Sequence, residues 1–402
     1  MAHELLLSLV LICSAPLIAQ GLERLSKITS TENSELNKQC TPQAPVPNRR
    51  NGQRKEERVP IFDVTPATTD SPSASFYRTV PPLRTIYGLS GLLNRKSNRK
   101  RYRRRKKKLR RSRKYRRRRI KRMMNGEKVT EAKYNVMINL MNGKSRCTGV
   151  LISSKHVLTA AHCFVTPRQC LKGAEKLTEP LYKKTDYPVE VHYGGTCASV
   201  LKGGSCPASE KTKTAAVAHV GVSRRYFASK CLSGDIAIVE LAEPLTVSYE
   251  TACLPSNTTR LQSQTTMSGY GYDPMNGWTK EKFLEKVTLM KERYCDPSIT
   301  RGKDTFCLRQ QAGSPCRGDS GAGVMQRAND AKDYVMGVLS KGLNCNDLHT
   351  ALVRRYNDNR EFRGMVITNT RDHLDWICLH TGVCEEHVDP KTMSKVRIVM
   401  IF

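Results

Sequence analysis

The sequence lacks a long apolar run. The apolar stretch from Leu5 to Ile12 is too short to span a bilayer, and small residues follow it as far as Gly21. This arrangement is typical of a secretory signal peptide over residues 1–21, although no lysine or arginine precedes the apolar run. A buried N-terminal strand is the alternative interpretation. We expect a secreted, extracellular protein without a membrane span.

Acidic residues are scarce in the first third of the chain. The whole sequence has 68 Lys and Arg against 36 Asp and Glu, a formal charge of +32. Residues 1–122 have 31 basic and 8 acidic residues, whereas residues 123–402 have 37 and 28. The basic character therefore belongs to the first third and says little about the partners of the rest.

Residues 95–122 contain no acidic residue and 21 Lys and Arg. Repulsion between like charges at this density disfavours a compact structure, so we expect an extended basic arm. Such an arm could bind heparan sulfate or other polyanions, and behind a signal peptide a nucleic-acid partner is disfavoured. The run ends in Arg119-Ile120-Lys121-Arg122, which fits the Arg-X-Lys/Arg-Arg pattern that furin-like convertases cut.

Residues 22–94 lack a sustained apolar period of 2 or 3.6 residues, so they are predicted to have no core of their own. With the basic arm they would form a disordered propeptide over residues 22–122. After residue 123, short apolar or β-prone stretches alternate with Gly, Ser and Asn, which indicates an all-β domain. These stretches are Asn135 to Leu140, Thr148 to Ile152, His156 to Leu158, Ile236 to Leu241 and Tyr334 to Ser340.

The end of the chain has the pattern of a short helix. Thr370 is a candidate N-cap, and Leu374 and Ile377 are apolar residues three positions apart. Residues 385–402 follow the last cysteine and are expected to form a C-terminal tail.

The stretch Cys316-Arg317-Gly318-Asp319-Ser320-Gly321-Ala322-Gly323 places a serine between glycines. Glycine lets the backbone bend there and leaves room for a substrate carbonyl to approach. His162 follows an apolar strand, and Asp235 directly precedes another. A carboxylate at Asp235 could hold the imidazole of His162 in one tautomer, while its other nitrogen takes the proton of Ser320. Each residue alone could be structural, but together they indicate nucleophilic catalysis.

Six motifs carry a family resemblance. They are Thr-Ala-Ala-His-Cys at 159–163, Asp-Ile-Ala at 235–237, Cys-Leu-Pro at 253–255, Gly-Tyr-Gly at 269–271, Gly-Asp-Ser-Gly at 318–321 and Ser-Lys-Gly at 340–342. In type and order they resemble the trypsin/chymotrypsin-like serine proteases over residues 123–384. The resemblance implies two six-stranded antiparallel β-barrels with a short C-terminal helix, and hydrolysis of peptide bonds in protein or peptide substrates through an acyl-enzyme. It implies no cofactor and no metal.

The resemblance also implies a role for each site residue. Ser320 would be the nucleophile, His162 the general base and Asp235 the carboxylate that orients it. The backbone N–H groups of Gly318 and Ser320 would form the oxyanion hole.

Activation by cleavage is implied as well. Residues 123–140 align without a gap with the mature N-terminal segment of the family, so the new N-terminus would be Met123. Its amine would pair with Asp319. Two separate arguments, the alignment and the convertase pattern, therefore choose the bond after Arg122.

The specificity pocket departs from the family. Ser314 takes the place where trypsin-like members carry an aspartate, which disfavours a strict preference for Arg or Lys. Lys341 replaces the usual tryptophan and adds a cation to the substrate groove. Ser340, Gly342 and Gly364 are the other expected substrate-binding residues.

Fourteen of the 15 cysteines follow the signal peptide, an even number that suits disulfides. The resemblance implies the pairs Cys147–Cys163, Cys295–Cys307, Cys316–Cys345 and Cys40–Cys253, of which the last would tether the propeptide. The pairing of the other six is left open, and zinc ligation is disfavoured in a secreted chain: Cys170, Cys197, Cys206, Cys231, Cys378 and Cys384. Asn257-Thr258-Thr259 is a candidate N-glycosylation site.

Two functions fit these features. The first is a secreted serine endopeptidase that is activated by cleavage after Arg122. The alternative is a catalytically weak or inactive protein that uses a protease fold and its basic arm to bind extracellular polyanions. Lys341 favours the alternative, and the complete set of His162, Asp235 and Ser320 favours the enzyme.

Overall fold

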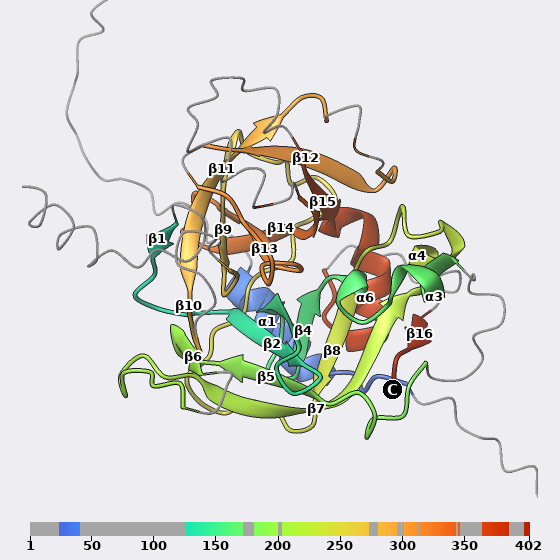
Figure 1. The fold of residues 1–402 in the computed structure, drawn as a ribbon. Helices are drawn as coiled ribbons and strands as arrows, with labels where there is room; N and C mark the ends of the chain where they lie inside the picture. The colour runs from blue at the N-terminus through green and yellow to red at the C-terminus, as the bar shows by residue number, and fades with distance from the viewer. Residues whose placement is uncertain are drawn as a thin grey trace, which may run out of the picture. The chain divides into compact units, whose positions relative to one another are not determined.

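The computed structural model describes residues 24–40, 126–171, 181–199, 203–272, 280–295, 299, 301–311, 313–342, 345, 364–385 and 398–402. The predicted signal peptide, the basic arm, Arg122 and Met123 lie outside these residues. Within them, two antiparallel sheets each close on themselves (Figure 1). Among the described helices, none combines the length and the apolar character needed to cross a membrane.

The first barrel has six strands in the order β7, β5, β2, β3, β4 and β8, and the pairing of β7 with β8 closes it. The strands are β2 (Asn135–Leu140), β3 (Ser145–Leu151), β4 (His156–Thr159), β5 (Val189–Tyr193), β7 (Lys213–Ser223) and β8 (Ala237–Leu241). Every residue of β2 and of β8 is buried. A strand buried on both faces carries apolar residues without strict alternation, as these two do.

The second barrel also has six strands, in the order β11, β12, β15, β14, β13 and β9, and β9 pairs back to β11. The strands are β9 (Gln264–Gly269), β11 (Glu285–Glu292), β12 (Thr305–Gln310), β13 (Gly323–Arg327), β14 (Asp333–Lys341) and β15 (Met365–Asn369). The short strand β1 (Glu127–Lys128) is added at the edge of β11. The prediction of two six-stranded barrels is therefore confirmed.

Short elements join and cover the barrels. A two-stranded sheet pairs β6 (Cys197–Ser199) with β10 (Glu281–Phe283), which connects the loops of both halves. The C-terminal helix α6 (Leu374–Thr381) is confirmed, but it follows a 3-10 turn, η3 (Thr370–His373), so Thr370 is not its N-cap. The remaining short elements are η1 (Ala161–Cys163), α3 (Pro167–Leu171) and α4 (Arg224–Ala228).

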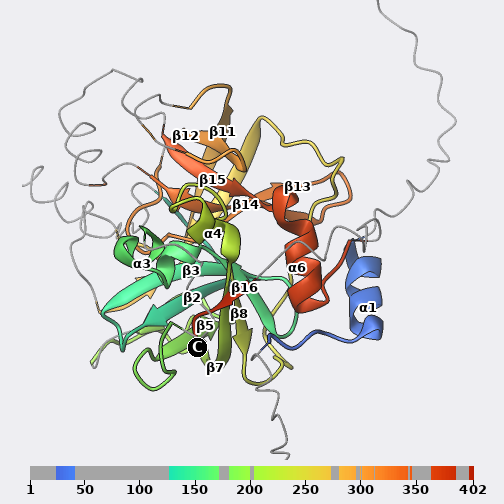
Figure 2. The ribbon, with the colours of Figure 1, turned by 90° about the vertical axis from the view of Figure 1, so that its right-hand side faces the viewer.

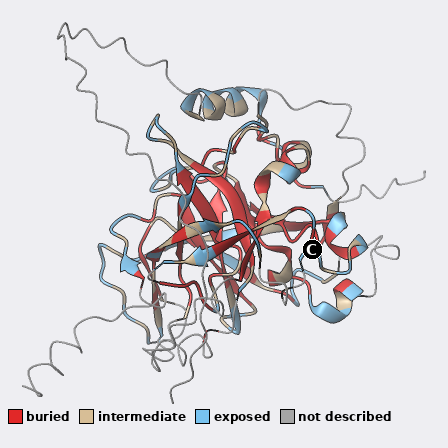
Figure 3. Ribbon diagram, turned by 90° about the horizontal axis from the view of Figure 1, so that it is seen from above, coloured by how far each residue is buried: buried red, intermediate tan, exposed pale blue. Residues whose placement is uncertain are grey.

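Residues 24–40 differ from the disordered propeptide that the composition predicts. They end in the helix α1 (Ser30–Cys40), which lies beside α6 (Figure 2) and is half-buried or exposed along its length (Figure 3). Before the helix, Leu25 and Ile28 are buried in the main hydrophobic core. The N–H of Ile28 donates to the carbonyl of Thr381 over 2.8 Å. These residues pack on the core of the barrels because they have no core of their own.

Part of the predicted tail is also ordered. Strand β16 (Ile398–Met400) pairs with β7 at the edge of the first barrel, and Ile401 and Phe402 are buried. The aromatic ring of Phe402 lies 6.4 Å from that of Tyr187.

Seven disulfides join the described cysteines. Four are the pairs that the family resemblance implies, and Cys40–Cys253 is among them. The other three are Cys170–Cys231, Cys197–Cys206 and Cys378–Cys384.

Candidate active site

His162 and Asp235 meet because β4 and β8 are neighbours. These strands pair antiparallel with Thr159 opposite Ala237, so the residues just beyond these two lie at the same end of the barrel. His162 Nδ1 lies 2.8 Å from Asp235 Oδ2, and the backbone N–H of His162 donates to Asp235 Oδ1 over 2.9 Å. The two bonds fix both the position and the tautomer of the ring, with the proton on Nδ1.

The surroundings adjust the charge of this pair. Burial acts to raise the pKa of Asp235, but the charge and hydrogen bonds of His162 outweigh it, and the Ser340 hydroxyl donates at 2.5 Å, so the pKa is lowered. Burial acts to lower the pKa of His162, but the Asp235 charge outweighs it and the pKa is raised. The charge of Lys341 acts against this rise. Asp235 therefore stays ionised at neutral pH.

Ser320 lies on the turn before β13 of the second barrel, and this turn contacts β3 of the first barrel. Gly318 and Gly321 have φ values of +96° and +80°, which side chains with a Cβ rarely adopt. Thr148 of β3 forms two hydrogen bonds with this turn. Its N–H donates to the Ser320 carbonyl and its hydroxyl donates to the Gly318 carbonyl, both over 2.9 Å. A Cβ on Gly321 would collide with Thr159. Glycine at position 321 therefore allows the turn to pack closely against the end of β4.

The N–H groups of Gly318 and Ser320 donate to no acceptor within the described part of the chain. An oxyanion hole consists of N–H groups that point at the position of a developing negative oxygen. Among the described residues, the Ser320 hydroxyl likewise makes no hydrogen bond to the His162 ring. The structure brings His162 and Asp235 into contact. The Ser320 turn lies beside them: the sulfur of Cys163, the residue after His162, lies 3.9 Å from the Ser320 carbonyl oxygen.

Asp319, the residue before Ser320, is buried in the protein and is 0% exposed. Its two carboxylate oxygens accept the N–H groups of Gly271 and Cys316, each over 2.7 Å. Burial raises the pKa of Asp319 to about 7, although these bonds and the charge of Lys282 act to lower it. Its negative charge is therefore only partly compensated in this state.

A cavity of about 340 Å³ opens beside Ser320, and Ser340, Lys341 and Gly342 line it. Arg317, which the sequence reasoning did not select, lies at the same cavity. The expected pocket residues Ser314 and Gly364 are buried but do not line it. The Ser314 hydroxyl instead donates to the carbonyl of Pro315 over 3.2 Å.

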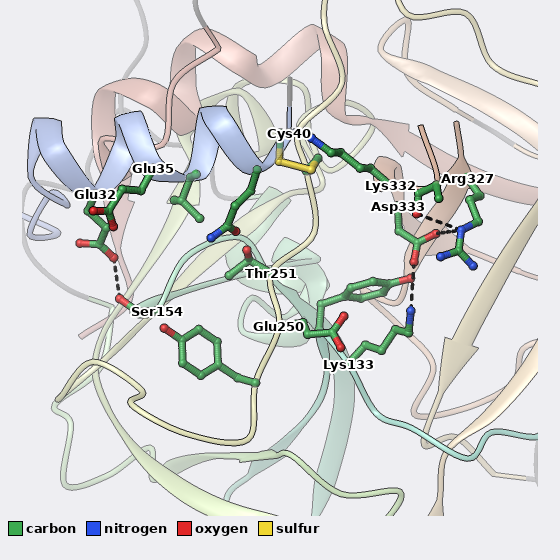
Figure 4. A pocket seen from close by; sticks show the side chains of 16 residues that line it. Glu32, Glu35, Cys40, Lys133, Ser154, Glu250, Thr251, Arg327, Lys332 and Asp333 are labelled. Atoms are coloured by element: carbon green, nitrogen blue, oxygen red, sulfur yellow. Dashed lines mark hydrogen bonds and ion pairs between the residues drawn. A yellow bond between two sulfur atoms is a disulfide. The ribbon is translucent and has the colours of Figure 1, made fainter. Parts of the chain in front are cut away.

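Another cavity, of about 610 Å³, lies away from the catalytic motifs, between α1 and the barrels (Figure 4). Its walls carry charges of both signs, and Asp333 lies within 3.7 Å and 3.8 Å of Lys133 and Arg327. Glu32 of α1 accepts a hydrogen bond from Ser154 over 2.6 Å. This cavity therefore lies at the contact between α1 and the barrels. No group of three or more His, Cys, Asp or Glu among the described residues could hold a metal ion.

Two antiparallel barrels with a His–Asp pair and a serine on a glycine turn define the class of the chymotrypsin-like serine hydrolases. The sequence profile described as Trypsin matches residues 123–359, and the chain belongs to this family. It is 28% identical over 257 residues to Trypsin-like protease try-5 of Caenorhabditis elegans, and the alignment covers 58% of this chain and 76% of that protein. It is 26% identical over 255 residues to Transmembrane protease serine 11A of Homo sapiens, covering 59% of this chain and 50% of that protein. The resemblance seen in the motifs is confirmed, and the family supports a serine protease function.

Proposed function

We propose that this protein is a secreted serine endopeptidase with Ser320 as nucleophile, His162 as general base and Asp235 as orienting carboxylate. The observation that carries the proposal is the pair of hydrogen bonds between His162 and Asp235, of 2.8 Å and 2.9 Å. The bond of 2.8 Å occupies Nδ1 of the ring, so that Nε2 is the nitrogen left to take a proton, and the bond of 2.9 Å holds the backbone of His162.

In the proposed reaction, Ser320 Oγ bonds to the carbonyl carbon of the substrate while its proton moves to His162 Nε2. The carbonyl oxygen becomes negative and accepts the N–H groups of Gly318 and Ser320, where one such donor contributes about 3 kcal/mol. The C–N bond then breaks as His162 passes its proton to the leaving amine. Water repeats these steps on the acyl-enzyme and restores Ser320. Substrate binding would turn the Ser320 hydroxyl toward the ring, because catalytic hydrogen bonds often tighten only in the complex.

We further propose that a furin-like convertase activates the protein by cutting after Arg122, which leaves residues 123–384 as the protease domain. The freed amine of Met123 would then reach Asp319. The raised pKa of Asp319, about 7, supports this step because a buried carboxylate with partly compensated charge gains most from a new cation.

For the substrate, we propose a side chain other than Arg or Lys in the specificity pocket. Arg317 and Lys341 both line the cavity beside Ser320, and two cations there disfavour a third. Ser314 adds no opposite charge.

The test of this function uses the secreted protein cut after Arg122. We expect it to react with a fluorophosphonate probe, and Ser320→Ala to abolish labelling and to lower kcat at least about ten-thousandfold. Arg122→Ala, which blocks the cut and leaves the catalytic residues intact, should give unlabelled precursor. A cut wild-type protein that neither labels nor hydrolyses any peptide would disprove the enzyme.

The second candidate function is polyanion binding by a protein with little or no activity. Lys341 favours it, because its charge acts to lower the pKa of His162, together with the basic composition of residues 95–122. Under either candidate function the protein would be extracellular. We also propose that Asn257 is glycosylated, and its side chain is exposed, as this requires. The labelling experiment separates the two.

A further inference from the structure

A second buried carboxylate–histidine pair lies where the two barrels and the C-terminal helix meet. Asp304 directly precedes β12, and His373 is the last residue of η3 before α6. His373 Nε2 lies 2.8 Å from Asp304 Oδ2, and their side chains are 3% and 1% exposed. A carboxylate so deeply buried requires partners that stabilise its charge.

The same oxygen of Asp304 also reaches the first barrel. The N–H of Gly234 donates to Asp304 Oδ2 over 2.7 Å, and Gly234 is the residue before Asp235. The two loops are tightly packed, because a Cβ on Gly302 would collide with Ser233. One carboxylate oxygen thus links three segments that are distant in the sequence.

The Asp304 carboxylate stays ionised, so it can keep its hydrogen bonds to His373 and Gly234. Burial acts to raise its pKa, but the hydrogen bond and charge of His373 and the bond from Gly234 outweigh it, and the pKa is lowered to about 2. The carboxylate is therefore ionised at neutral pH, and hydrogen bonds to an ionised carboxylate are stronger than those to a neutral group.

The bond from Gly234 holds one side of a tight turn. The N–H of Ile236 donates to the Gly234 carbonyl over 2.7 Å, which places Asp235 at the centre of a three-residue γ-turn. Gly234 has a φ of +74°, so few other residues could form this turn. Strand β8 fixes the other side. The direction of the Asp235 carboxylate therefore depends on what holds the peptide group before it.

We propose that Asp304 and His373 are positioning residues: they hold the turn that carries Asp235 and, through it, the hydrogen bonds from Asp235 to His162. The catalytic part of this inference rests on the proposed function. Neither residue touches the substrate. A pair that only stabilised the fold would change the unfolding temperature but not the titration of His162.

The test measures kinetics of the cut enzyme with Asp304→Ala. We expect kcat to fall roughly 10- to 100-fold, the range seen when a group that only orients a reacting residue is lost, with KM changed by less than about twofold. The acid limb of kcat/KM should move to lower pH, because a displaced Asp235 raises the pKa of His162 less.

The matched control is Thr381→Val at the far end of α6. Thr381 is 0% exposed, and its hydroxyl donates to Ile377 and accepts the N–H of Val383. Its loss should lower stability without changing kcat or the acid limb. If both variants lower kcat alike, the role of Asp304 is structural and the proposal is wrong.

Asp304→Ala could fail to fold, because it leaves the buried N–H of Gly234 without an acceptor. His373→Gln and His373→Leu then decide the question, since the amide of glutamine can donate to Asp304 and leucine cannot. We expect kcat near wild type for His373→Gln and at least about fivefold lower for His373→Leu. Equal kcat values in these two folded variants would overturn the proposal.

A measurement without turnover separates this inference from the proposed function. In Ser320→Ala protein, NMR of labelled histidine follows the titration of His162 with and without Asp304→Ala. A lower His162 pKa in the double variant supports the positioning role even if the parent protein hydrolyses nothing, in which case only the function fails. An unchanged His162 pKa overturns the positioning role.

Discussion

At the scale of single residues, the site divides into what local sequence could predict and what it could not. His162, Asp235 and Ser320 each follow from a motif at a strand end or a glycine turn, so their types and order could be interpreted without a structure. Asp304 and His373 carry no motif and lie 69 residues apart. Their pairing exists only because η3 returns to the start of β12, which no local pattern encodes.

Ser340 shows a finer limit. The sequence resemblance assigned it to substrate binding, and it does line the cavity, but its hydroxyl also donates to Asp235 over 2.5 Å. It therefore stabilises the Asp235 carboxylate as well as lining the cavity. The charge of the adjacent residue Lys341 acts to lower the pKa of His162, which makes Lys341 a simple residue to test.

Lys341→Gln should move the acid limb of activity to higher pH. The general base must be neutral, so activity is lost as pH falls through the His162 pKa, which is already raised. Lys341 acts to lower that pKa, so removing its charge raises it further. We expect a loss of kcat/KM at pH 6 with little change at pH 8, measured with an uncharged peptide substrate.

The control for this prediction is Lys341→Arg, which keeps the charge and should keep the pH profile. High salt should reduce the difference between Lys341→Gln and wild type, because salt screens partly exposed charges. An acid limb that stays in place, or moves to lower pH, would contradict the assigned effect of Lys341.

At the scale of elements, strands were predictable and the N-terminal segment was not. The stretches expected to be β-strands overlap β2, β3, β4, β8 and β14, and their ends differ by up to a few residues. The helix α1 has no buried residue, so it has no apolar period to detect. It does carry a capping signal: the N–H of Glu32 donates to the Thr29 hydroxyl over 3.1 Å.

The segment before α1 is bound by polar contacts as well as by burial. Ser26 contacts the buried carboxylate of Glu240 through its N–H, at 3.2 Å, and through its hydroxyl. Its carbonyl lies 2.9 Å from His156 Nε2, and Lys155 donates to its hydroxyl over 2.8 Å. Residues 24–28 therefore bind the first barrel through polar contacts of Ser26 as well as through the buried Leu25 and Ile28.

We expect this segment to stay bound without its disulfide. In a Cys40→Ser, Cys253→Ser double variant cut after Arg122, the propeptide should still co-elute with the protease in gel filtration. Leu25 is 5% exposed, and burying such a side chain contributes about 1.5–3 kcal/mol. Adding Leu25→Asp to the double variant should therefore release the propeptide.

Lys27→Ser is the matched control, because Lys27 lies in the same segment and is exposed. It should leave the complex intact in the double variant. Release of the propeptide from the double variant alone would mean that the disulfide, and not the docked segment, holds it.

At the scale of the whole molecule, the uneven distribution of charge means that attachment of the propeptide would also keep most of the positive charge with the protease domain. Most of the net charge of +32 lies before residue 123, outside the family match of residues 123–359. If residues 24–40 stay docked and Cys40 stays bonded to Cys253, the proposed cleavage after Arg122 would leave the basic arm attached to the domain. The active enzyme would then be localised by the arm, separately from its catalytic specificity.

Heparin chromatography of precursor and cut enzyme tests this. Each phosphate or sulfate contact by Lys or Arg releases counterions, so the salt needed for elution reports the basic residues engaged. We expect precursor and cut wild type to elute at the same salt concentration, and a deletion of residues 95–122 at a lower one. The Cys40→Ser, Cys253→Ser, Leu25→Asp variant should elute with the precursor before the cut and with the deletion variant after it. Cut wild type that elutes with the deletion variant would show that the arm is lost on activation, and unchanged retention after the deletion would remove the arm from polyanion binding.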